Sequence, residues 1–210
     1  MGKIEITKKV LGICATNCYT VVDTETKEAL IIDPADRADV LIRDWKDKGV
    51  TPTAVLLTHG HFDHIGALTG VKKEYPDIKV YAAAKEKEVM ESPALNLSSS
   101  FGAAFTAQAD IYLEDGAEIE VLGRKCKCLL VPGHTKGGMC YYFPEENVVF
   151  TGDTLFCYSV GRTDFPTGDA KALEDAIREK LFLLPDETLV LPGHDAQTMI
   201  GKEKTGNPYF

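Results

Sequence analysis

This 210-residue chain contains four short motifs of one kind, and three of them hold all of its five histidines. Each motif follows an apolar, strand-like segment and combines a glycine with a side chain that can bind a metal ion. The segments and the motifs that follow them are Ala54–Leu57 with Thr58–His64, Cys128–Val131 with Pro132–Thr135, Val148–Phe150 with Thr151–Thr154, and Leu189–Leu191 with Pro192–Asp195. In α/β folds, ligands bind where loops leave the carboxyl ends of strands, and glycine lets a backbone approach such a site closely. We therefore expect the four motifs to meet at one edge of the fold.

The first motif, His-x-His-x-Asp-His, is the most informative, because four potential metal ligands fall within six residues. His59 and His61 are expected on the same side of an extended loop. Asp63 and His64 follow at the start of a helix and can face elsewhere, which splits the motif into two ligand sets. The other motifs add His134, Asp153 and His194. Imidazole and carboxylate donors together suit zinc, iron or manganese, so a metal site is expected.

The elements that must position these residues alternate between strand-like and helix-like patterns. The expected strands are Cys18–Asp23, Ala29–Asp33, Ala54–Leu57, Lys79–Ala83, Glu118–Leu122, Lys127–Val131, Met139–Phe143, Val148–Phe150 and Leu189–Leu191, the first two as a hairpin. The expected helices are Asp36–Lys48, His64–Glu74, a short one through Met90, and Asp169–Leu184. Two β-rich halves with helices predict a sandwich of two sheets covered by helices, in a single domain over residues 1–210.

Two segments lack such a pattern. Residues 91–107 contain Pro93, three consecutive serines and Gly102, and are interpreted as a lid or binding loop, or else as a plain surface excursion. The residues after the last expected strand, which ends at Leu191, form a polar tail. The sequence gives neither segment a defined structure.

Composition narrows the class of protein and of partner. Hydrophobic residues make up 44% and charged residues 26% of the chain, as in an ordinary globular protein. The formal net charge of −9 argues against a nucleic-acid binder and against attraction to an anionic membrane. No signal-peptide pattern and no membrane-span length of apolar residues is found, so a cytoplasmic protein is expected. The six cysteines form no CxxC pair and are expected to be reduced thiols.

The histidine motifs resemble those of the metallo-β-lactamase superfamily, whose hallmark is His-x-His-x-Asp-His followed by spaced His, Asp and His. The resemblance covers essentially the whole chain and implies that family's four-layer αββα sandwich, an α/β (α+β) fold. It also implies two divalent metal ions, with zinc expected first and iron or manganese as alternatives. The implied ligands are His59, His61 and His134 for one ion, Asp63, His64 and His194 for the other, and Asp153 as a bridge. The resemblance implies a hydrolase in which Asp153 bridges the ions and Asp63 also orients the nucleophilic water.

Further residues are similar to one branch of the superfamily, the hydroxyacylglutathione hydrolases of the glyoxalase II type. These residues are Gly152–Phe156, Ser159–Asp164 and Asn17–Tyr19. The similarity implies cleavage of small thioesters such as S-D-lactoylglutathione. Full-length glyoxalase II binds glutathione through basic residues of a separate C-terminal helical domain. This chain ends at Phe210 and resembles shorter bacterial relatives. The substrate could therefore be a small thioester of a thiol other than glutathione.

Three basic residues are candidates for contact with an anionic substrate. Arg162 is expected chiefly to bind a carboxylate such as Asp164 through charge-assisted hydrogen bonds, with contact to the substrate as the alternative. Lys202 and Lys204 lie in the polar tail, where they could meet a substrate carboxylate. Exposed lysines are usually only solvated surface, so this role is the weaker interpretation.

The same ligand residues are also compatible with other activities. Persulfide dioxygenases share this fold and the His59, His134 and Asp153 set but use one iron, and such a site with open positions suits oxygen chemistry. A lactonase is a further alternative. Zinc β-lactamases commonly place Cys or Ser where Asp153 lies, which disfavours β-lactamase activity. The complete set of seven donors disfavours a non-enzymatic metal-binding module.

Overall fold

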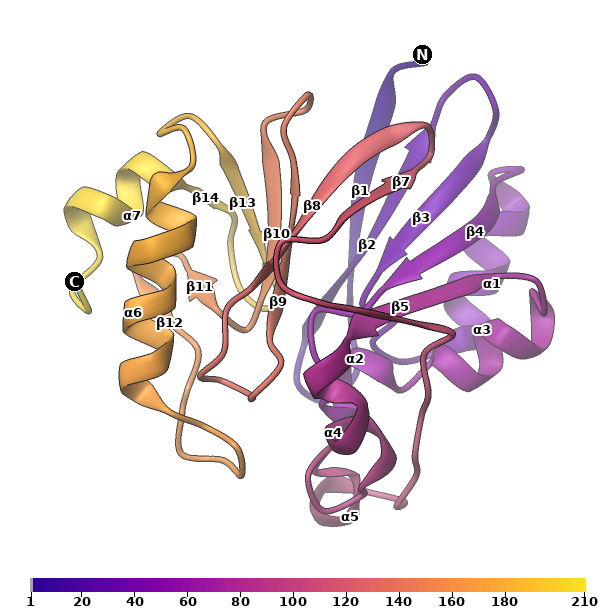
Figure 1. The fold of residues 1–210 in the computed structure, drawn as a ribbon. Coiled ribbons are helices and arrows are strands. Elements are labelled where there is room, and N and C mark those ends of the chain that lie inside the picture. The colour runs from indigo at the N-terminus through magenta and orange to yellow at the C-terminus, as the bar shows by residue number, and fades with distance from the viewer. Residues whose placement is uncertain (1) are drawn as a thin grey trace.

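The computed structural model describes residues 2–210 and contains two six-stranded sheets that face each other (Figure 1). In spatial order, the first sheet consists of β1 (Ile4–Leu11), β2 (Thr16–Asp23), β3 (Glu28–Ile32), β4 (Thr51–Leu56), β5 (Lys79–Ala83) and β6 (Ile111–Leu113). The second consists of β14 (Thr198–Met199), β13 (Leu189–Pro192), β10 (Val148–Gly152), β9 (Met139–Phe143), β8 (Arg124–Leu130) and β7 (Glu118–Val121). A separate short hairpin pairs β11 (Leu155–Phe156) with β12 (Ser159–Val160).

Helices cover the outer faces of both sheets (Figure 1). The first sheet is covered by α1 (Ala38–Asp47) and α3 (Leu68–Glu74), and the second by α6 (Ala170–Lys180) and α7 (Ile200–Gly206). The shorter helices are α2 (Phe62–Ile65), η1 (Ala84–Glu86), α4 (Lys87–Glu91), α5 (Ser98–Phe101) and η2 (Leu181–Leu183). The order helix, sheet, sheet, helix confirms the expected αββα sandwich.

Alternate residues of the central strands explain this layering. In β3, Ala29 and Ile31 pack with Trp45 of α1, whereas Leu30 and Ile32 pack toward the second sheet. All four β3 side chains are at most 1% exposed. Burial of one Leu or Ile side chain contributes roughly 1.5–3 kcal/mol, so a strand that is apolar on both faces is stable only in such a central layer.

Strand direction brings the motif loops together. β10 and β13 run parallel, and β8 and β10 both run antiparallel to β9, so β8, β10 and β13 share one direction. The loops after these three strands therefore leave the second sheet at the same edge. The loop after β4 is joined to the second sheet there, because the Met139 N–H donates to the Thr58 carbonyl oxygen at 2.8 Å.

The first strand was not predicted from the sequence. The hairpin of β2 and β3 is confirmed, but β1 pairs antiparallel with β2 along its full length. β1 lies at the edge of its sheet, and its side chains are exposed or half-buried. Two consecutive lysines, Lys8 and Lys9, interrupt its apolar alternation, so the period-two pattern is weak.

Two helical segments also differ from expectation. The single helix expected over His64–Glu74 is two helices, α2 and α3, because the chain between them closes onto residues 34 and 35: the Ala67 N–H donates to the Pro34 carbonyl oxygen at 2.9 Å. The expected polar tail contains β14 and α7, and Ile200 and Glu203 of α7 are fully buried. Short elements with one buried face carry too little periodicity to be recognised in a sequence.

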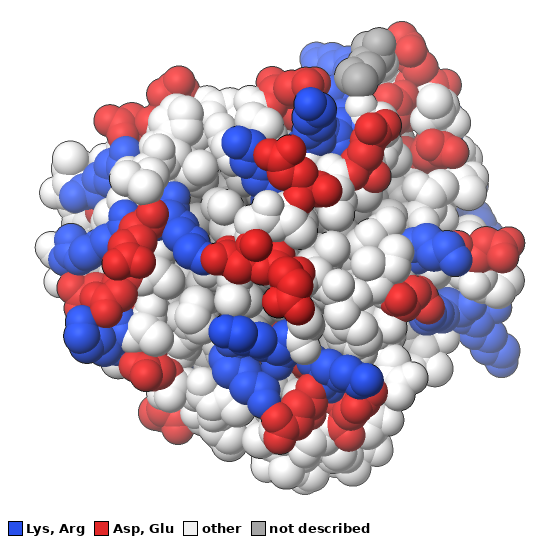
Figure 2. Space-filling model, viewed as in Figure 1, with Lys and Arg blue, Asp and Glu red and all other residues white. Residues whose placement is uncertain are grey.

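The visible surface carries charges of both signs. On the face shown in Figure 2, lysine and arginine side chains are interspersed with aspartate and glutamate. That face offers no broad cationic area of the kind that binds nucleic-acid phosphates. Within residues 2–210, no helix combines the length and the apolar character that a bilayer span requires.

Candidate metal centre

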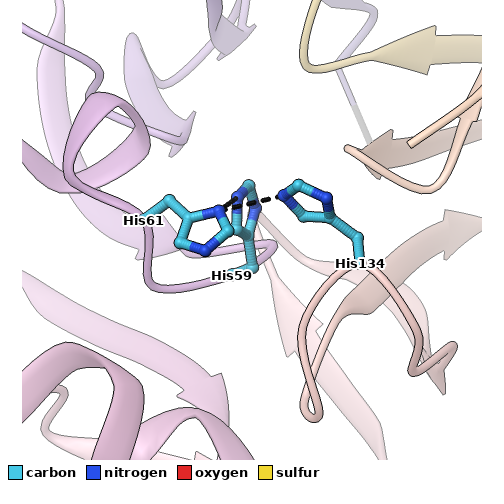
Figure 3. Close-up of side chains that lie close together, drawn as sticks. All are labelled: His59, His61 and His134. Carbon is cyan, nitrogen blue, oxygen red and sulfur yellow. Dashed lines mark hydrogen bonds between the residues drawn. The ribbon is translucent and has the colours of Figure 1, made fainter. Parts of the chain in front are cut away.

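Three histidines form a first ligand set (Figure 3). The loop after β4 supplies His59 and His61, the loop after β8 supplies His134, and all three side chains are buried. His61 Nδ1 lies 3.1 Å from His59 Nε2 and 2.9 Å from His134 Nε2. Two nitrogens bound to one zinc ion at about 2.0–2.1 Å in tetrahedral geometry would be about 3.3–3.4 Å apart. The three nitrogens are therefore spaced much as ligands of one ion.

A hydrogen bond fixes which nitrogen of His134 faces this set. His134 Nδ1 lies 2.7 Å from the carbonyl oxygen of Arg162, which can only accept, so Nδ1 carries the proton. In the neutral ring, the lone pair of His134 Nε2 then points at His61 Nδ1. Either a proton on His61 Nδ1 or a metal ion must lie between these two nitrogens, because two converging lone pairs would repel each other. The lone pair of His134 Nε2 is in this way available to a metal ion.

The second ligand set is Asp63, His64 and His194, and Asp153 lies between the two sets. Asp63 Oδ2 is 3.6 Å from His64 Nε2 and 3.4 Å from His194 Nε2. Asp153 Oδ1 is 3.3 Å from His64 Nε2, and its Oδ2 is 3.3 Å from His194 Nε2. The same Oδ2 is 3.6 Å from His134 Nε2 of the first set. Asp153 therefore reaches both sets, as a bridging ligand must.

Atoms without hydrogen-bond partners point into this cluster. Among the described residues, His64 Nε2 and Asp153 Oδ1 are buried atoms that lack a partner, although they face each other. Leaving a buried polar atom unsatisfied costs about 1–3 kcal/mol, and a metal ion would satisfy both. The structure thus brings all seven residues of the sequence-based ligand set together, and they fit divalent metal ions.

Comparison with known proteins gives the family. The profile of the Metallo-beta-lactamase superfamily matches residues 11–194. The chain belongs to this superfamily. The probable metallo-hydrolase YqgX of Bacillus subtilis is 38% identical over 202 residues, which cover 95% of this chain and 94% of YqgX. The hydroxyacylglutathione hydrolase GloC of Haemophilus influenzae is 35% identical over 200 residues, which cover 92% of each protein.

Solved structures agree with this assignment. The B3 metallo-beta-lactamase BLEG-1 has a TM-score of 0.92 and 39% identity, over 98% of this chain and 99% of BLEG-1. TTHA1623 in a di-iron-bound form has a TM-score of 0.85 and 36% identity, over 97% of this chain and 100% of TTHA1623. ETHE1 from Myxococcus xanthus has a TM-score of 0.79 and 31% identity, over 97% of this chain and 83% of ETHE1. The chain thus has the metallo-β-lactamase fold and a cluster suited to divalent ions, as a metal-dependent hydrolase requires.

A buried carboxylate outside the seven ligands orients His64 in this superfamily member. Asp33 follows β3 and is 1% exposed. Its Oδ2 accepts hydrogen bonds from His64 Nδ1 at 2.8 Å and from the Thr58 hydroxyl at 2.6 Å. Because His64 donates from Nδ1, the lone pair of its Nε2 faces the cluster. In the sequence, Asp33 is predicted only as the end of a strand, and its one signal is an acidic side chain directly after an apolar run.

Residues of β2 anchor the loop that carries His194. The Asn17 side-chain amide donates to the carbonyl oxygens of Pro192 and Asp195 at 2.9 and 3.1 Å. The Tyr19 hydroxyl donates to the same Pro192 oxygen at 2.7 Å. Asn17 and Tyr19 are 1% and 3% exposed, so these bonds are shielded from water. The sequence singled out this segment only by its similarity to glyoxalase II, and the structure gives it a positioning role.

A second buried carboxylate, that of Glu86, joins the two loops of the first ligand set. One of its oxygens accepts from the Gly60 N–H at 2.7 Å. The other accepts from the Thr135 hydroxyl at 2.6 Å and from the Gly137 N–H at 2.8 Å. Burial raises the pKa of Glu86, and these three hydrogen bonds offset part of that rise. Glu86 could not be predicted as a functional residue, because no motif in the sequence around its short helix distinguishes it from other glutamates.

Two glycines permit the close packing of the loops around Asp153. Gly152 has a φ of 51°, and a Cβ at this position would collide with the Thr58 hydroxyl. A Cβ on Gly193 would lie 2.7 Å from His64 Cε1 and would also collide with the Asp153 carboxylate. Glycine is therefore required at both positions for steric reasons.

The two ligand sets differ in charge. Burial and the neighbouring imidazoles lower the pKa of His59 well below its usual value and that of His61 to about 3. Burial opposes the charged form of His194, but hydrogen bonds to two carboxylates raise its pKa to about 9. Burial likewise opposes protonation of His64, but the surrounding carboxylates raise its pKa well above the usual value. Without metal, His59 and His61 are neutral, whereas His64 and His194 hold protons that an ion must displace.

Arg162 lies beside the metal centre but is already paired. Its Nε and Nη2 each donate to the Asp164 carboxylate at 2.7 Å, so the expected pair is present. Its guanidinium also lies 3.9 Å from the centre of the Phe165 ring. The backbone carbonyl of Arg162 is the group that fixes His134, which gives this loop a structural function.

The two lysines of the C-terminal segment are not brought to the metal centre. Lys204 Nζ donates to the Leu184 carbonyl oxygen at 3.1 Å and to Asp186 at 2.5 Å. These partners precede β13, whereas His194 follows its carboxyl end, so Lys204 lies toward the opposite end of that strand. Lys202 is exposed, and neither lysine is among the described residues that line the cavity at the metal centre.

A cavity of about 470 Å³ opens onto the cluster. Side chains of both ligand sets line it, together with Leu97 and Phe101 of the segment over residues 91–107. This segment is held against the ligand loop, because the Phe62 N–H donates to the Asn96 carbonyl oxygen at 2.8 Å. The Asn96 side chain in turn donates to the Phe105 carbonyl oxygen at 2.9 Å. The segment is therefore a fixed wall of the cavity.

Proposed function

We propose that this protein is a binuclear metal-dependent hydrolase that cleaves small thioesters such as S-D-lactoylglutathione. The observation that carries the proposal is the position of Asp153, whose carboxylate lies between two complete ligand sets. A shared carboxylate beside an open cavity suits attack of water on a carbonyl carbon. The similarity to the hydroxyacylglutathione hydrolase GloC supports a thioester as the substrate.

The seven ligands would hold two divalent ions, with zinc expected first and iron or manganese as alternatives. One ion would bind to His59, His61 and His134, the other to Asp63, His64 and His194, and Asp153 would contact both. Bound ions would supply an acidified water and polarise the substrate carbonyl. Hydrolysis then adds water across the carbon–sulfur bond and releases a carboxylate and a thiol.

Asp63 has a second role in the proposal, as the group that orients the attacking water. Its side chain lines the cavity, and its Oδ2 accepts a hydrogen bond from the Thr16 hydroxyl at 2.7 Å. Burial opposes ionisation of Asp63, but the charge of His64 and the hydrogen bond of His194 lower its pKa to about 2. A carboxylate that is ionised and fixed in this way accepts a hydrogen bond from water in one direction.

The test is loss of the thioester bond of S-D-lactoylglutathione, measured with protein whose zinc, iron and manganese contents are known. We expect turnover that a chelator abolishes and that returns when metal is added back. Protein with both ligand sets filled and no turnover of any small thioester would contradict the proposal.

A second candidate is oxidation of a persulfide at a single iron. The set expected from the sequence was His59, His134 and Asp153, whereas the compact group of two histidines and one carboxylate in the structure is His59, His64 and Asp153. This type of donor set, found in non-haem iron oxygenases, supports the candidate. Oxygen uptake with a persulfide by protein that holds one iron and cleaves no thioester would support this candidate. We rank this candidate below the hydrolase because a single iron would leave the second ligand set, which includes His194, without an ion.

A further inference from the structure

The wall of the cavity outside the metal ligands is mostly apolar. The apolar residues that line it are Phe62, Leu97, Phe101, Phe156, Val160 and Phe165. They come from the first ligand loop, from the segment over residues 91–107 and from the loops that follow Asp153. Because these segments are distant in the sequence, the apolar surface is a property of the assembled site.

Aromatic rings of this wall lie next to both ligand sets. The Phe165 ring is centred 6.0 Å from the His61 ring, beside the first set. The Phe156 ring is centred 6.1 Å from the His194 ring, beside the second set. A substrate whose carbonyl lies over the cluster therefore has an aromatic surface on either side of it.

The mouth of the cavity carries an aromatic stack with a free face. Phe62 and Phe101 are parallel, with ring centres 5.2 Å apart and an angle of 10° between the planes. Phe101 is 48% exposed although it is a large apolar side chain. Leu97 directly precedes α5, the helix that carries Phe101, and has a φ of 67°, which is strained for a leucine. Strain next to an exposed ring at a cavity mouth is typical of a segment shaped for a ligand.

Among the described residues, the side chains that line the cavity offer an anionic substrate no unpaired cation, so only the two ions of the proposed function would attract it. Arg162, the cationic side chain of the described lining, is neutralised by its paired hydrogen bonds to Asp164. Asp195 also lines the cavity and adds a negative charge. Lys8 lies near the rim, where it donates to the Asp195 carbonyl oxygen at 3.2 Å. The two carboxylates of a glutathione thioester would find no unpaired cation in this lining.

We propose that the apolar wall makes this protein selective for thioesters with an aromatic or bulky apolar acyl group. The inference rests on the thioesterase function proposed above and names its substrate class. The free face of Phe101 covers the acyl group, and Phe156 and Phe165 contact it beside the cluster. Glutathione is not required as the thiol, because its carboxylates have no cationic partner here.

Four thioesters separate the contributions of acyl group and thiol. They combine a lactoyl or a phenylacetyl group with glutathione or the uncharged thiol N-acetylcysteamine. With either thiol, we expect kcat/KM for phenylacetyl to exceed that for lactoyl by about tenfold or more, since a desolvated apolar ring contributes about that much to discrimination. Phe101→Ala lowers this ratio about tenfold. The matched control is Leu183→Ala, which removes an apolar side chain that is 78% exposed outside the cavity lining and leaves the ratio unchanged.

The opposite pattern overturns the proposal. A preference for both glutathione thioesters that Arg162→Ala or Lys8→Ala abolishes would show that the site recognises anions. If no thioester is cleaved, the hydrolase function fails, and the wall is tested on its own by calorimetric binding of the phenethyl thioether of N-acetylcysteamine to metal-loaded protein. An increase of about tenfold in Kd in Phe101→Ala supports the apolar wall, and an unchanged Kd overturns it.

Discussion

The Glu86 carboxylate accepts a 2.6 Å hydrogen bond from the Thr135 hydroxyl with one oxygen and a 2.7 Å bond from the Gly60 N–H with the other. A single buried side chain thereby joins the loop of His59 and His61 to the loop of His134. The relative position of the three histidines depends on this link, since the two loops belong to different sheets.

Glu86→Gln tests this link. Both carboxylate oxygens of Glu86 accept hydrogen bonds. In a glutamine, an NH₂ group replaces one of these oxygens and cannot accept, so at least one of the hydrogen bonds is lost. We expect affinity for the first metal ion to fall about 10–100-fold and the free energy of unfolding of metal-free protein to fall by about 1–3 kcal/mol. Chelator competition and thermal unfolding measure the two effects. Glu88→Gln, in the exposed pair with Lys136, is the control, and equal metal affinity in both variants would refute the role of Glu86.

Asp33→Asn tests whether binding of the second ion can be weakened without an effect on the first. The amide can still accept from the Thr58 N–H, but its NH₂ group would face His64 Nδ1 and favour the tautomer with a proton on Nε2. We expect the second ion to bind about 10–100-fold more weakly while the first is retained. Metal analysis after dialysis gives the count per chain, with the exposed Asp47→Asn as control. Loss of both ions in equal measure would contradict an action through His64.

Binding of the second ion is expected to depend on pH. His194 has a pKa of about 9 in the metal-free protein, above its usual 6.5, so its protonated form stabilises the fold fully below pH 6.5 and this contribution disappears as pH rises through 9. The same proton must leave when a metal ion binds, so affinity for the second ion rises with pH up to about 9. Zinc calorimetry in buffers of different ionisation heat measures the protons released. Equal release at pH values of about 7 and 10 would contradict the assignment.

Asp153→Ala removes the residue common to both sets. Metal content should fall below two ions per chain, and turnover should fall by at least about a hundredfold, because the Asp153 carboxylate reaches ligands of both sets. Both quantities are measured on the same preparation. Full activity at unchanged metal content would rule out a bridging role.

Lys204→Ala tests the role of the C-terminal segment. Because Lys204 is bonded to Leu184 and Asp186, we expect KM for a glutathione thioester to stay unchanged and stability to fall by about 0.5–1 kcal/mol. Steady-state kinetics and thermal unfolding distinguish the outcomes. A rise of several-fold in KM without loss of stability would instead place this lysine at the substrate.

The ligands could be predicted from the sequence because each lies in a local motif directly after an apolar strand. The residues that orient them could not. Asp33 acts on His64 across 31 positions of the chain, and Glu86 acts on Thr135 across 49. Such pairs depend on how the sheets pack, which no spacing rule contains. For the same reason Lys204 was a candidate in the sequence, while the structure places its ammonium beside Asp186.

The fold shows the same division. Strands that are apolar on both faces, such as β3, were predictable, whereas the half-exposed edge strand β1 was not. The segment that forms α7 is predicted as a polar tail, because most of its residues are polar. Only the burial of Ile200 and Glu203 in the structure identifies it as part of the sandwich. Amphipathic segments at the margins need their packing partner to be recognised.

The order of the ligand loops along the chain has a consequence for biosynthesis. His59, His61, Asp63 and His64 are synthesised before His134, Asp153 and His194. Each set needs a histidine that follows a strand of the second sheet, so neither ion can be held by all its ligands until the second sheet has docked on the first. A chain in which the two sheets have not packed together therefore lacks a complete ligand set for either ion.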